Sequence, residues 1–197
     1  MLKRIIPIFI CLTFLISFVC GCQLKFWNID DSWKAAYLDY IEEHKDSHTS
    51  YALVNIDDDN IPELYLSGIA EAIGDSVCTY KNGVVIEQTL NRIGGGYYNE
   101  KGQLYNYNGT TGTFYTHIYK LSDQGFTLTF EALILEKIKQ LENGELAIVY
   151  EYSVDGNPID VKDYDSAIES HFDFSLTKPL NENAVDYNTI KKQINMY

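Results

Sequence analysis

The spacing of hydrophobic positions first predicts a helix near the start of the chain. Between residues 31 and about 47, apolar and aromatic side chains recur every three or four positions: Trp33, Ala36, Tyr37, Tyr40, Ile41 and His44. This spacing places them on one face of an α-helix. Asp30 and Asp31 suit the positive N-terminal end of that helix, and Lys45 suits its last turn.

The middle of the chain has the alternating pattern of antiparallel strands. Asn82-Gly83 separates Val77–Lys81 from Val84–Gln88, and Asn-Gly between apolar runs is a strong signal for a hairpin. Two further strands are predicted from stripes of alternate residues: Phe126, Leu128, Phe130, Ala132 and Ile134, then Leu146, Ile148, Tyr150 and Tyr152. The segment Glu131–Gln140 is rich in helix formers, so it is predicted as either strand or helix.

Helical spacing returns near the C-terminus. Asp160-Val-Lys-Asp163 resembles a capping box, and Asn183 is expected to cap a last helix. The apolar positions of these two helices are Tyr164, Ala167, Ile168 and His171, then Tyr187, Ile190 and Ile194. We therefore predict a single α+β domain over residues 31–197: an N-terminal amphipathic helix, an antiparallel β meander and two C-terminal helices.

An acidic segment between two apolar runs is the main candidate site. The sequence Asn55–Glu63, N-I-D-D-D-N-I-P-E, has oxygen-bearing side chains at Asn55, Asp57, Asp59 and Glu63, the first, third, fifth and ninth positions of the loop. A loop folded around a hard cation can turn these side chains inward, and the carbonyl of Ile61 can add a further oxygen. The segment therefore predicts a calcium site that holds a hairpin together.

This loop resembles the D-x-D-x-D-G-x-x-D calcium hairpins of integrin-type and FG-GAP propeller blades. Asn55 replaces the first Asp of that pattern and Asn60 replaces the Gly, and both differences imply weak binding. An EF-hand is excluded, because its twelfth position would be Leu66 instead of Glu. The alternative interpretation is an acidic β-turn that holds no metal.

The first 30 residues read as an export signal and a short tether. Lys3-Arg4 precedes an apolar run from Ile5 to Val19, which is typical of a secretory signal. Val19-Cys-Gly-Cys22 resembles the lipobox of bacterial lipoproteins, which implies cleavage after Gly21 and diacylglyceryl attachment to Cys22. Residues 1–21 are thus expected to be the signal peptide, and residues 22–30 the lipidated Cys and its tether. Cys78 would then be the one free thiol of the mature chain, and its strand-like surroundings favour a buried structural role.

Charge narrows the range of partners. The chain has 28 acidic and 15 basic residues, for a formal charge of −13. The first 21 residues contain two basic and no acidic residues, so their removal takes this charge to −15. Such a surface repels nucleic acid, so we expect no nucleic-acid partner.

Tyrosines are concentrated between residues 97 and 119, where they alternate with Asn, Thr and Gly. Tyr97, Tyr98, Tyr105 and Tyr107 are the candidates for a ligand surface, on which a glycan, peptide or protein could bind. Tyr is also a common strand residue, so packing within a sheet is the alternative.

The sequence contains no recognisable catalytic motif. There is no Gly-x-Ser-x-Gly, no zinc-binding His-Glu pair and no Cys-x-x-Cys. Trp33 to Tyr37 and the I-D-x-D-x-I-P-E-L pattern of Ile56 to Leu64 resemble Gram-positive surface lipoproteins of uncharacterised function. We therefore expect an extracytoplasmic binding or accessory module, anchored to the bacterial membrane through Cys22, that is not an enzyme. The alternative is a glycan-directed cell-envelope hydrolase with unidentified carboxylates.

Overall fold

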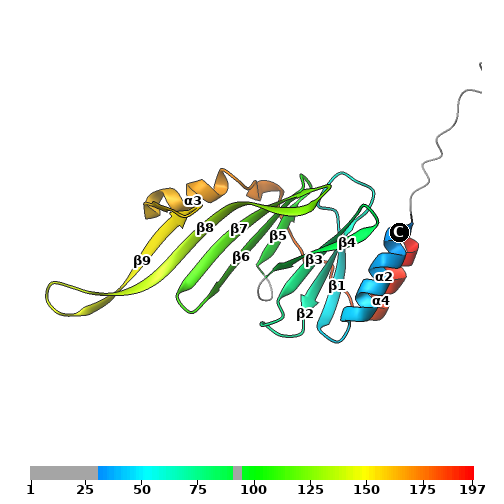
Figure 1. The fold of residues 1–197 in the computed structure, drawn as a ribbon, viewed down its shortest axis with the longest axis horizontal. Coiled ribbons are helices and arrows are strands. Elements are labelled where there is room, and N and C mark those ends of the chain that lie inside the picture. Colours follow the sequence, from blue (N-terminus) through cyan, green and yellow to red (C-terminus); the bar gives the residue numbers. More distant parts are fainter. Residues whose placement is uncertain (1–30, 91–94) are drawn as a thin grey trace, which may run out of the picture. The chain divides into compact units, whose positions relative to one another are not determined.

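The computed structural model describes residues 31–90 and 95–197 (Figure 1), and residues 32–197 form one compact unit. Within the described residues the chain is mostly antiparallel β-sheet with some helices. A four-stranded sheet comes first, in the order β1-β2-β3-β4: His48–Val54, Glu63–Gly68, Asp75–Lys81 and Val84–Leu90. The predicted Asn82-Gly83 hairpin joins β3 to β4, and both turn residues have positive φ, as a type I′ turn requires.

A seven-stranded sheet follows, with the order β10-β9-β8-β7-β6-β5-β11. Its strands are β5 Gly96–Asn99, β6 Gln103–Thr110, β7 Thr113–Ser122, β8 Gly125–Gln140, β9 Leu146–Val154, β10 Asn157–Ile159 and β11 Lys178–Pro179. Strands β5 to β10 form the predicted meander, in which each strand pairs with the next. The segment Glu131–Gln140 is strand, because Glu131 pairs with β7 and Ala132–Gln140 pair with β9.

Helices cover the outer face of the first sheet. Helix α2, Ser32–His44, and helix α4, Tyr187–Met196, pack against this face with Trp33, Tyr37, Ile41, Ile190 and Ile194, all of which are buried. Figure 1 shows the two helices side by side next to β1. The segment that leads into α4 also pairs with β1: Tyr51 and Val185 exchange backbone hydrogen bonds of 2.8 and 2.7 Å. The first and last parts of the unit therefore share one core.

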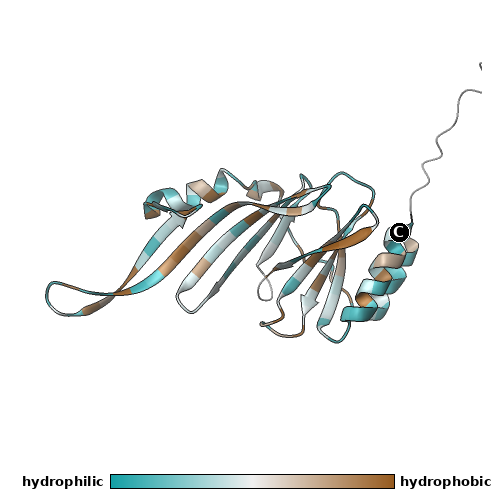
Figure 2. Cartoon of the chain, viewed as in Figure 1, coloured by the Kyte–Doolittle hydropathy of each residue, from teal (hydrophilic) through white to brown (hydrophobic). Residues whose placement is uncertain are grey.

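Two further cores lie on the two faces of the second sheet. The core between the sheets contains Ala52, Val54, Ile56, Tyr65, Val77, Leu90, Tyr98, Leu104, Tyr119, Leu121 and Leu180. The other face is covered by helix α3, Val161–Glu169, and the short 3₁₀ helix η2, Phe174–Leu176. Beneath this cover pack Ile118, Phe130, Ala132, Tyr164, Ile168 and Phe172. Figure 2 shows the resulting alternation of apolar and polar positions along the strands.

A β-bulge in β8 corrects the predicted stripe from Phe126 to Ile134. Ile118 of β7 pairs with Phe130, but the next residue, Tyr119, pairs with Leu128, so Thr129 is the extra residue. One inserted residue exchanges the two faces of a strand. Phe126 therefore packs in the core between the sheets, whereas Phe130 packs beneath α3. The stripe is divided between two cores instead of lining one.

Both C-terminal helices form, but neither N-terminus is capped as predicted. Asp160 is the N-cap of α3, and its side chain makes no capping hydrogen bond. Helix α4 is capped by Asp186 instead of Asn183, and the Asp186 carboxylate accepts the backbone N–H groups of Asn188 and Thr189. No helix within residues 31–90 and 95–197 has the length and hydropathy needed to cross a bilayer.

Candidate functional site

The acidic segment forms the loop that joins β1 to β2. Val54 and Glu63 pair as the last rung of the two strands, so the loop itself is residues 55–62. Two of its carboxylates fold it locally: Asp57 Oδ1 accepts the N–H of Asp59 at 3.1 Å, and Asp59 Oδ1 accepts the N–H of Ile61 at 2.7 Å. Asp side chains commonly stabilise turns in this way. Each carboxylate keeps its second oxygen for another partner.

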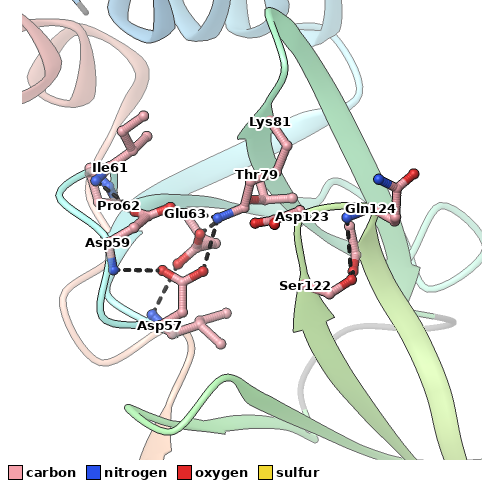
Figure 3. Close-up of polar contacts among 12 residues, drawn as sticks. Asp57, Asp59, Ile61, Pro62, Glu63, Thr79, Lys81, Ser122, Asp123 and Gln124 are labelled. Carbon is pink, nitrogen blue, oxygen red and sulfur yellow. Dashed lines mark hydrogen bonds and ion pairs between the residues drawn. The ribbon is translucent and has the colours of Figure 1, made fainter. Parts of the chain in front are cut away.

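That partner is Lys81, the last residue of β3. Its Nζ lies 2.9 Å from Asp57 Oδ2 and 2.5 Å from Asp59 Oδ2, and only 11% of its side chain is exposed (Figure 3). Burial alone would lower the pKa of Lys81, but the hydrogen bonds to Asp59 and Asp57 outweigh it, and the pKa is raised. The position between the two carboxylates is therefore already occupied by a positive charge.

Glu63 faces the interior. It is fully buried, and its carboxylate accepts the backbone N–H of Ile56 at 2.9 Å and the hydroxyl of Thr79 at 3.1 Å. Burial raises the pKa of Glu63 to about 8, and the Ile56 hydrogen bond opposes this shift. The hydroxyl of Tyr37 donates to the carbonyl of Pro62 at 3.0 Å, which attaches helix α2 to the end of the loop. The loop is thus held from three sides.

The structure brings together only part of the expected ligand set. Asp57 and Asp59 converge on one cation. Asn55 Oδ1 instead accepts a hydrogen bond from the hydroxyl of Tyr197 at 3.3 Å, and both oxygens of Glu63 are bonded to protein donors. In the described part of the chain, no three His, Cys, Asp or Glu side chains are grouped as metal ligands. The structure thus places two of the expected ligands, Asp57 and Asp59, around one position, and the Lys81 ammonium occupies it.

Lys81 is the residue that sequence reasoning missed. The available signal was a lysine at the end of a predicted strand, directly before the Asn82-Gly83 turn. Strand register decides whether such a lysine reaches the loop. That register depends on the pairing of β2 with β3, in which Leu64 lies opposite Cys78.

The four candidate tyrosines are divided between the two faces of the second sheet. Tyr98 is 8% exposed and packs in the core between the sheets, so it does not belong to a ligand surface. Tyr97 lies opposite Tyr105 in the β5–β6 register, and Tyr107 follows two residues later on the same face. Tyr97 and Tyr107 are 39% and 46% exposed. The predicted surface therefore consists of Tyr97, Tyr105 and Tyr107 alone.

Tyr105 supports this surface from below. Its ring contacts Tyr97 edge-on at 6.1 Å between centroids, Phe174 at 5.2 Å and Phe172 at 5.2 Å. Phe174, in η2, is 43% exposed. We call Tyr97, Tyr107 and Phe174, which present their rings to solvent on the α3 side of the sheet, the aromatic surface. Sequence reasoning missed Phe174, because a 3₁₀ turn brings it there from far along the chain.

A polar groove adjoins the aromatic surface. It has a volume of about 460 Å³, and its lining includes Lys101, Gln103, Glu169, His171, Asp173 and Phe174. Lys101 Nζ lies 3.2 Å from Asp173 Oδ2, and Gln103 donates to the carbonyl of His171 at 2.8 Å. Hydrogen bonds from Ser175 and then from Lys101 lower the pKa of Asp173. The groove thus combines charged, amide and imidazole groups with the edge of an aromatic surface.

A second polar pair lies on the opposite face of the sheet. His117 and Glu131 are directly opposite each other in β7 and β8, with Nε2 and Oε2 at 2.8 Å. The other ring nitrogen of His117 is 3.3 Å from the Tyr119 hydroxyl, and the ring stacks on Tyr115.

Cys78 has the structural role that was predicted. It is fully buried in β3 against the helices, and burial raises the pKa of its thiol. A protonated, inaccessible thiol is a poor nucleophile. The proposed lipidation residue, Cys22, and the signal peptide lie outside the described residues.

Comparisons with known proteins gave no relative. No protein-family model matches the chain, and no match was found among curated proteins or solved structures. Function must therefore be argued from the chain's own residues.

Proposed function

We propose that this chain is a lipid-anchored, extracytoplasmic α+β protein that acts as a binding module. Its ligand class is carbohydrate, bound across the aromatic surface and the polar groove beside it. Exposed aromatic rings stack on the apolar faces of sugar rings, and neighbouring side chains donate to and accept from sugar hydroxyls.

The observation that carries this proposal is the exposure of rings that the fold could have buried. Tyr97, Tyr107 and Phe174 are each about two-fifths exposed, although Tyr105 beside them is packed among aromatic rings. Gln103, two residues before Tyr105 on β6, lines the groove, so rings and hydrogen-bonding groups are continuous. A surface of this kind suits a ligand that is both apolar and rich in hydroxyl groups.

The location of the protein is proposed from the lipobox resemblance of Val19–Cys22. Two acyl chains on Cys22 would anchor it stably, because each buried methylene contributes about 0.8 kcal/mol. The acidic charge of the chain agrees with the expectation that nucleic acid is not a partner. A glycan of the cell envelope is the partner that such a position offers.

We also propose calcium as a structural cation of the loop between β1 and β2. Two carboxylates, Asp57 and Asp59, already share one positive charge, and calcium would take the place of the Lys81 ammonium. A divalent ion would offset both carboxylates where the lysine offsets one. Outside a cell a Kd of about 10⁻⁴ to 10⁻³ M is sufficient for this role.

A glycan hydrolase is the second candidate function, because two carboxylates line the groove. These are Glu169 and Asp173, and hydrogen bonds from Ser175 and then from Lys101 lower the pKa of Asp173. Hydrolysis needs one ionised carboxylate and one that gives up a proton. Glu169 is the other carboxylate of the groove.

The test is binding of the chain without its first 22 residues to an array of cell-envelope and plant glycans, followed by titration of the best one. Replacing Tyr97 and Tyr107 together by Ala should weaken binding at least tenfold. Leu128→Ala is the control, because Leu128 is 45% exposed but lies on β8, outside the aromatic surface. Equal loss in both variants, or no glycan bound at millimolar concentration, would refute the proposal. Release of reducing ends that is lost in Glu169→Gln would identify a hydrolase instead.

A further inference from the structure

Strands β8 and β9 extend beyond the sheet as a two-stranded ribbon, which we define as residues 136–151. Strand β7 begins at Thr113, opposite Leu135, and β10 ends at Ile159, opposite Tyr152. Figure 1 shows the hairpin continuing past the neighbouring strands. Within the described residues, Leu146–Glu151 therefore pair with β8 on one side and with no strand on the other.

The register shows which backbone groups point to the open side. Leu141 donates its N–H to Glu145, and Asp155 donates its N–H to Glu131 at the other end of the strand pair. Along an antiparallel pair, residues that hydrogen-bond to the opposite strand alternate with residues that do not. Counted from either bond, Leu146, Ile148 and Tyr150 fall at the positions that do not bond to β8. Their N–H and C=O groups therefore point away from β8. These outward N–H and C=O groups can therefore form hydrogen bonds with another strand.

The side chains of the same three residues form an apolar face. Leu146, Ile148 and Tyr150 are 70%, 58% and 50% exposed, and Ile138, opposite Ile148, is 73% exposed. Apolar positions recur along both strands of the ribbon (Figure 2). Further along the same face, Ile134 and Tyr152 are packed in the core beneath α3. A ligand for this edge must therefore supply both backbone hydrogen bonds and alternate apolar side chains, and only an extended polypeptide does so.

A groove lies at the base of the ribbon, on the open side of β9. It has a volume of about 560 Å³ and is lined by Tyr150, Tyr152, Pro158, Ile159 and Val161, among others. At the opposite end of the ribbon, Leu141 begins the turn and is 42% exposed. An antiparallel partner with the same sequence would bring its turn to this groove.

We propose that the open edge of β9 pairs with the same edge of a second copy, antiparallel, with Ile148 on the two-fold axis. Ile148 then lies opposite Ile148 of the second copy, and Leu146 opposite its Tyr150, so all outward backbone groups of these three residues are bonded. Two-fold symmetry is the commonest arrangement of such self-complementary surfaces. The turn of each ribbon reaches the groove at the base of the other.

Charge on the other face of the ribbon is balanced in this arrangement. Glu151 would lie beside Glu145 of the second copy, and two like charges there would oppose pairing. Lys137, which lies 2.5 Å from Glu151, stands on one side of this pair, and Lys139 of the second copy stands on the other. The four charges sum to zero, so the edge can pair although the whole chain is acidic.

The experiment uses residues 23–197, which contain the whole compact unit and have buried Cys78 as their single thiol. Ile148→Cys should form a disulfide-linked dimer on mild oxidation, since directly paired strand residues have the Cα separation that a disulfide needs. Leu146→Cys and Tyr150→Cys should cross-link when mixed, and each far less when alone. Val84→Cys is the control, because Val84 is equally exposed on β4.

A second experiment tests whether the protein dimerises in solution without a cross-link. Light scattering after size exclusion should give twice the monomer mass for the parent chain at 100 μM and monomer for Ile148→Lys, because a lysine on an edge strand opposes pairing. Val84→Lys should remain dimeric. A parent chain that stays monomeric and gives no Ile148→Cys cross-link overturns the proposal and leaves the edge to a strand of another protein. Cross-linking of Val84→Cys to the same extent also overturns it.

Discussion

The carboxylate of Glu63 accepts the backbone N–H of Ile56 at 2.9 Å, and both residues are fully buried. This bond closes the acidic loop from inside, whereas Lys81 closes it from the surface. A buried donor such as the Ile56 N–H is costly to leave unbonded. Glu63 is therefore part of the fold of the loop, in addition to any part in cation binding.

The protonation of Glu63 should make stability depend on pH. Its pKa is raised from 4.5 to about 8 in the folded chain, so the folded state binds this proton more tightly than the unfolded state. The free energy of unfolding should therefore fall as pH rises from about 4.5 to 8, by at most about 1.4 kcal/mol per pH unit. Glu63→Gln should flatten this dependence, as urea unfolding at pH 5, 6.5 and 8 would show.

Glu136→Gln is the control for this measurement, because Glu136 is exposed on the ribbon. It should leave the pH profile of the parent chain unchanged. Parallel profiles for Glu63→Gln and the parent would show that Glu63 does not carry the dependence.

Removing the Lys81 ammonium should expose the affinity of the loop for calcium. In EDTA, Lys81→Met should lower stability by about 1 kcal/mol, because Asp57 and Asp59 lose their shared counter-charge. In 1 mM calcium the variant should regain more stability than the parent gains, about 0.4 to 1.4 kcal/mol for a Kd of about 10⁻³ to 10⁻⁴ M. Thermal melts in EDTA, calcium and magnesium measure this difference.

Two comparisons make the calcium result specific. Lys101→Met removes an exposed ion pair with Asp173 but leaves the loop intact, so its calcium response should equal that of the parent. Asp57→Ala/Asp59→Ala should abolish the response of the loop. If the melts of Lys81→Met coincide in all three solutions, the loop does not bind calcium. In the parent chain it is then an acidic turn closed by Lys81 alone.

Deleting Thr129 should be far more damaging than mutating it. Thr129→Ala removes one hydrogen bond, from its hydroxyl to the carbonyl of Ile118 at 3.0 Å, and should cost about 1 kcal/mol. Deletion removes the bulge, so either Phe126 or Phe130 must leave its core, at about 3 kcal/mol or more. Urea unfolding of the two variants tests this. Similar midpoints for both would show that the sheet accommodates either register.

The two Asp residues at helix N-termini should contribute differently to the free energy of unfolding. Asp186→Ala removes hydrogen bonds to the N–H groups of Asn188 and Thr189 and should destabilise the chain by about 1 kcal/mol. Asp160→Ala removes no capping bond and should change stability by less than about 0.5 kcal/mol. Chemical denaturation measures both. A larger effect at Asp160 would contradict this assignment of the caps.

Local signals predicted most elements correctly, because local physics decides them. The Asn82-Gly83 turn needs positive φ at two positions, and these two residue types tolerate it. Trp33, Tyr37 and Ile41 recur at helical spacing, and they form the buried face of α2. Such features depend on neighbours within a few residues, which a sequence displays directly.

The features that were missed depend on pairing between distant segments. Alternation along β8 is the same with or without a bulge, and only its register against Ile118 and Tyr119 shows that Thr129 is extra. In the same way, alternation separates Tyr97 from Tyr98 but does not say which of the two faces is open. Lys81 reaches the acidic loop through strand pairing. The proximity of Asp57 and Asp59 was therefore predictable from the sequence, whereas their counter-charge was not.

The bridge between Tyr51 and Val185 also bears on the order in which the chain acquires its structure. Residue 51 belongs to the first strand described, and residue 185 precedes the last helix. When the chain emerges N-terminus first, α2 and the first sheet must wait for α4 before Trp33 and Ile41 are covered. Contacts between such distant segments slow folding and prolong exposure of apolar surface. Trp33 and Ile41 therefore stay uncovered until α4 has been synthesised, and their apolar surface is exposed over that interval.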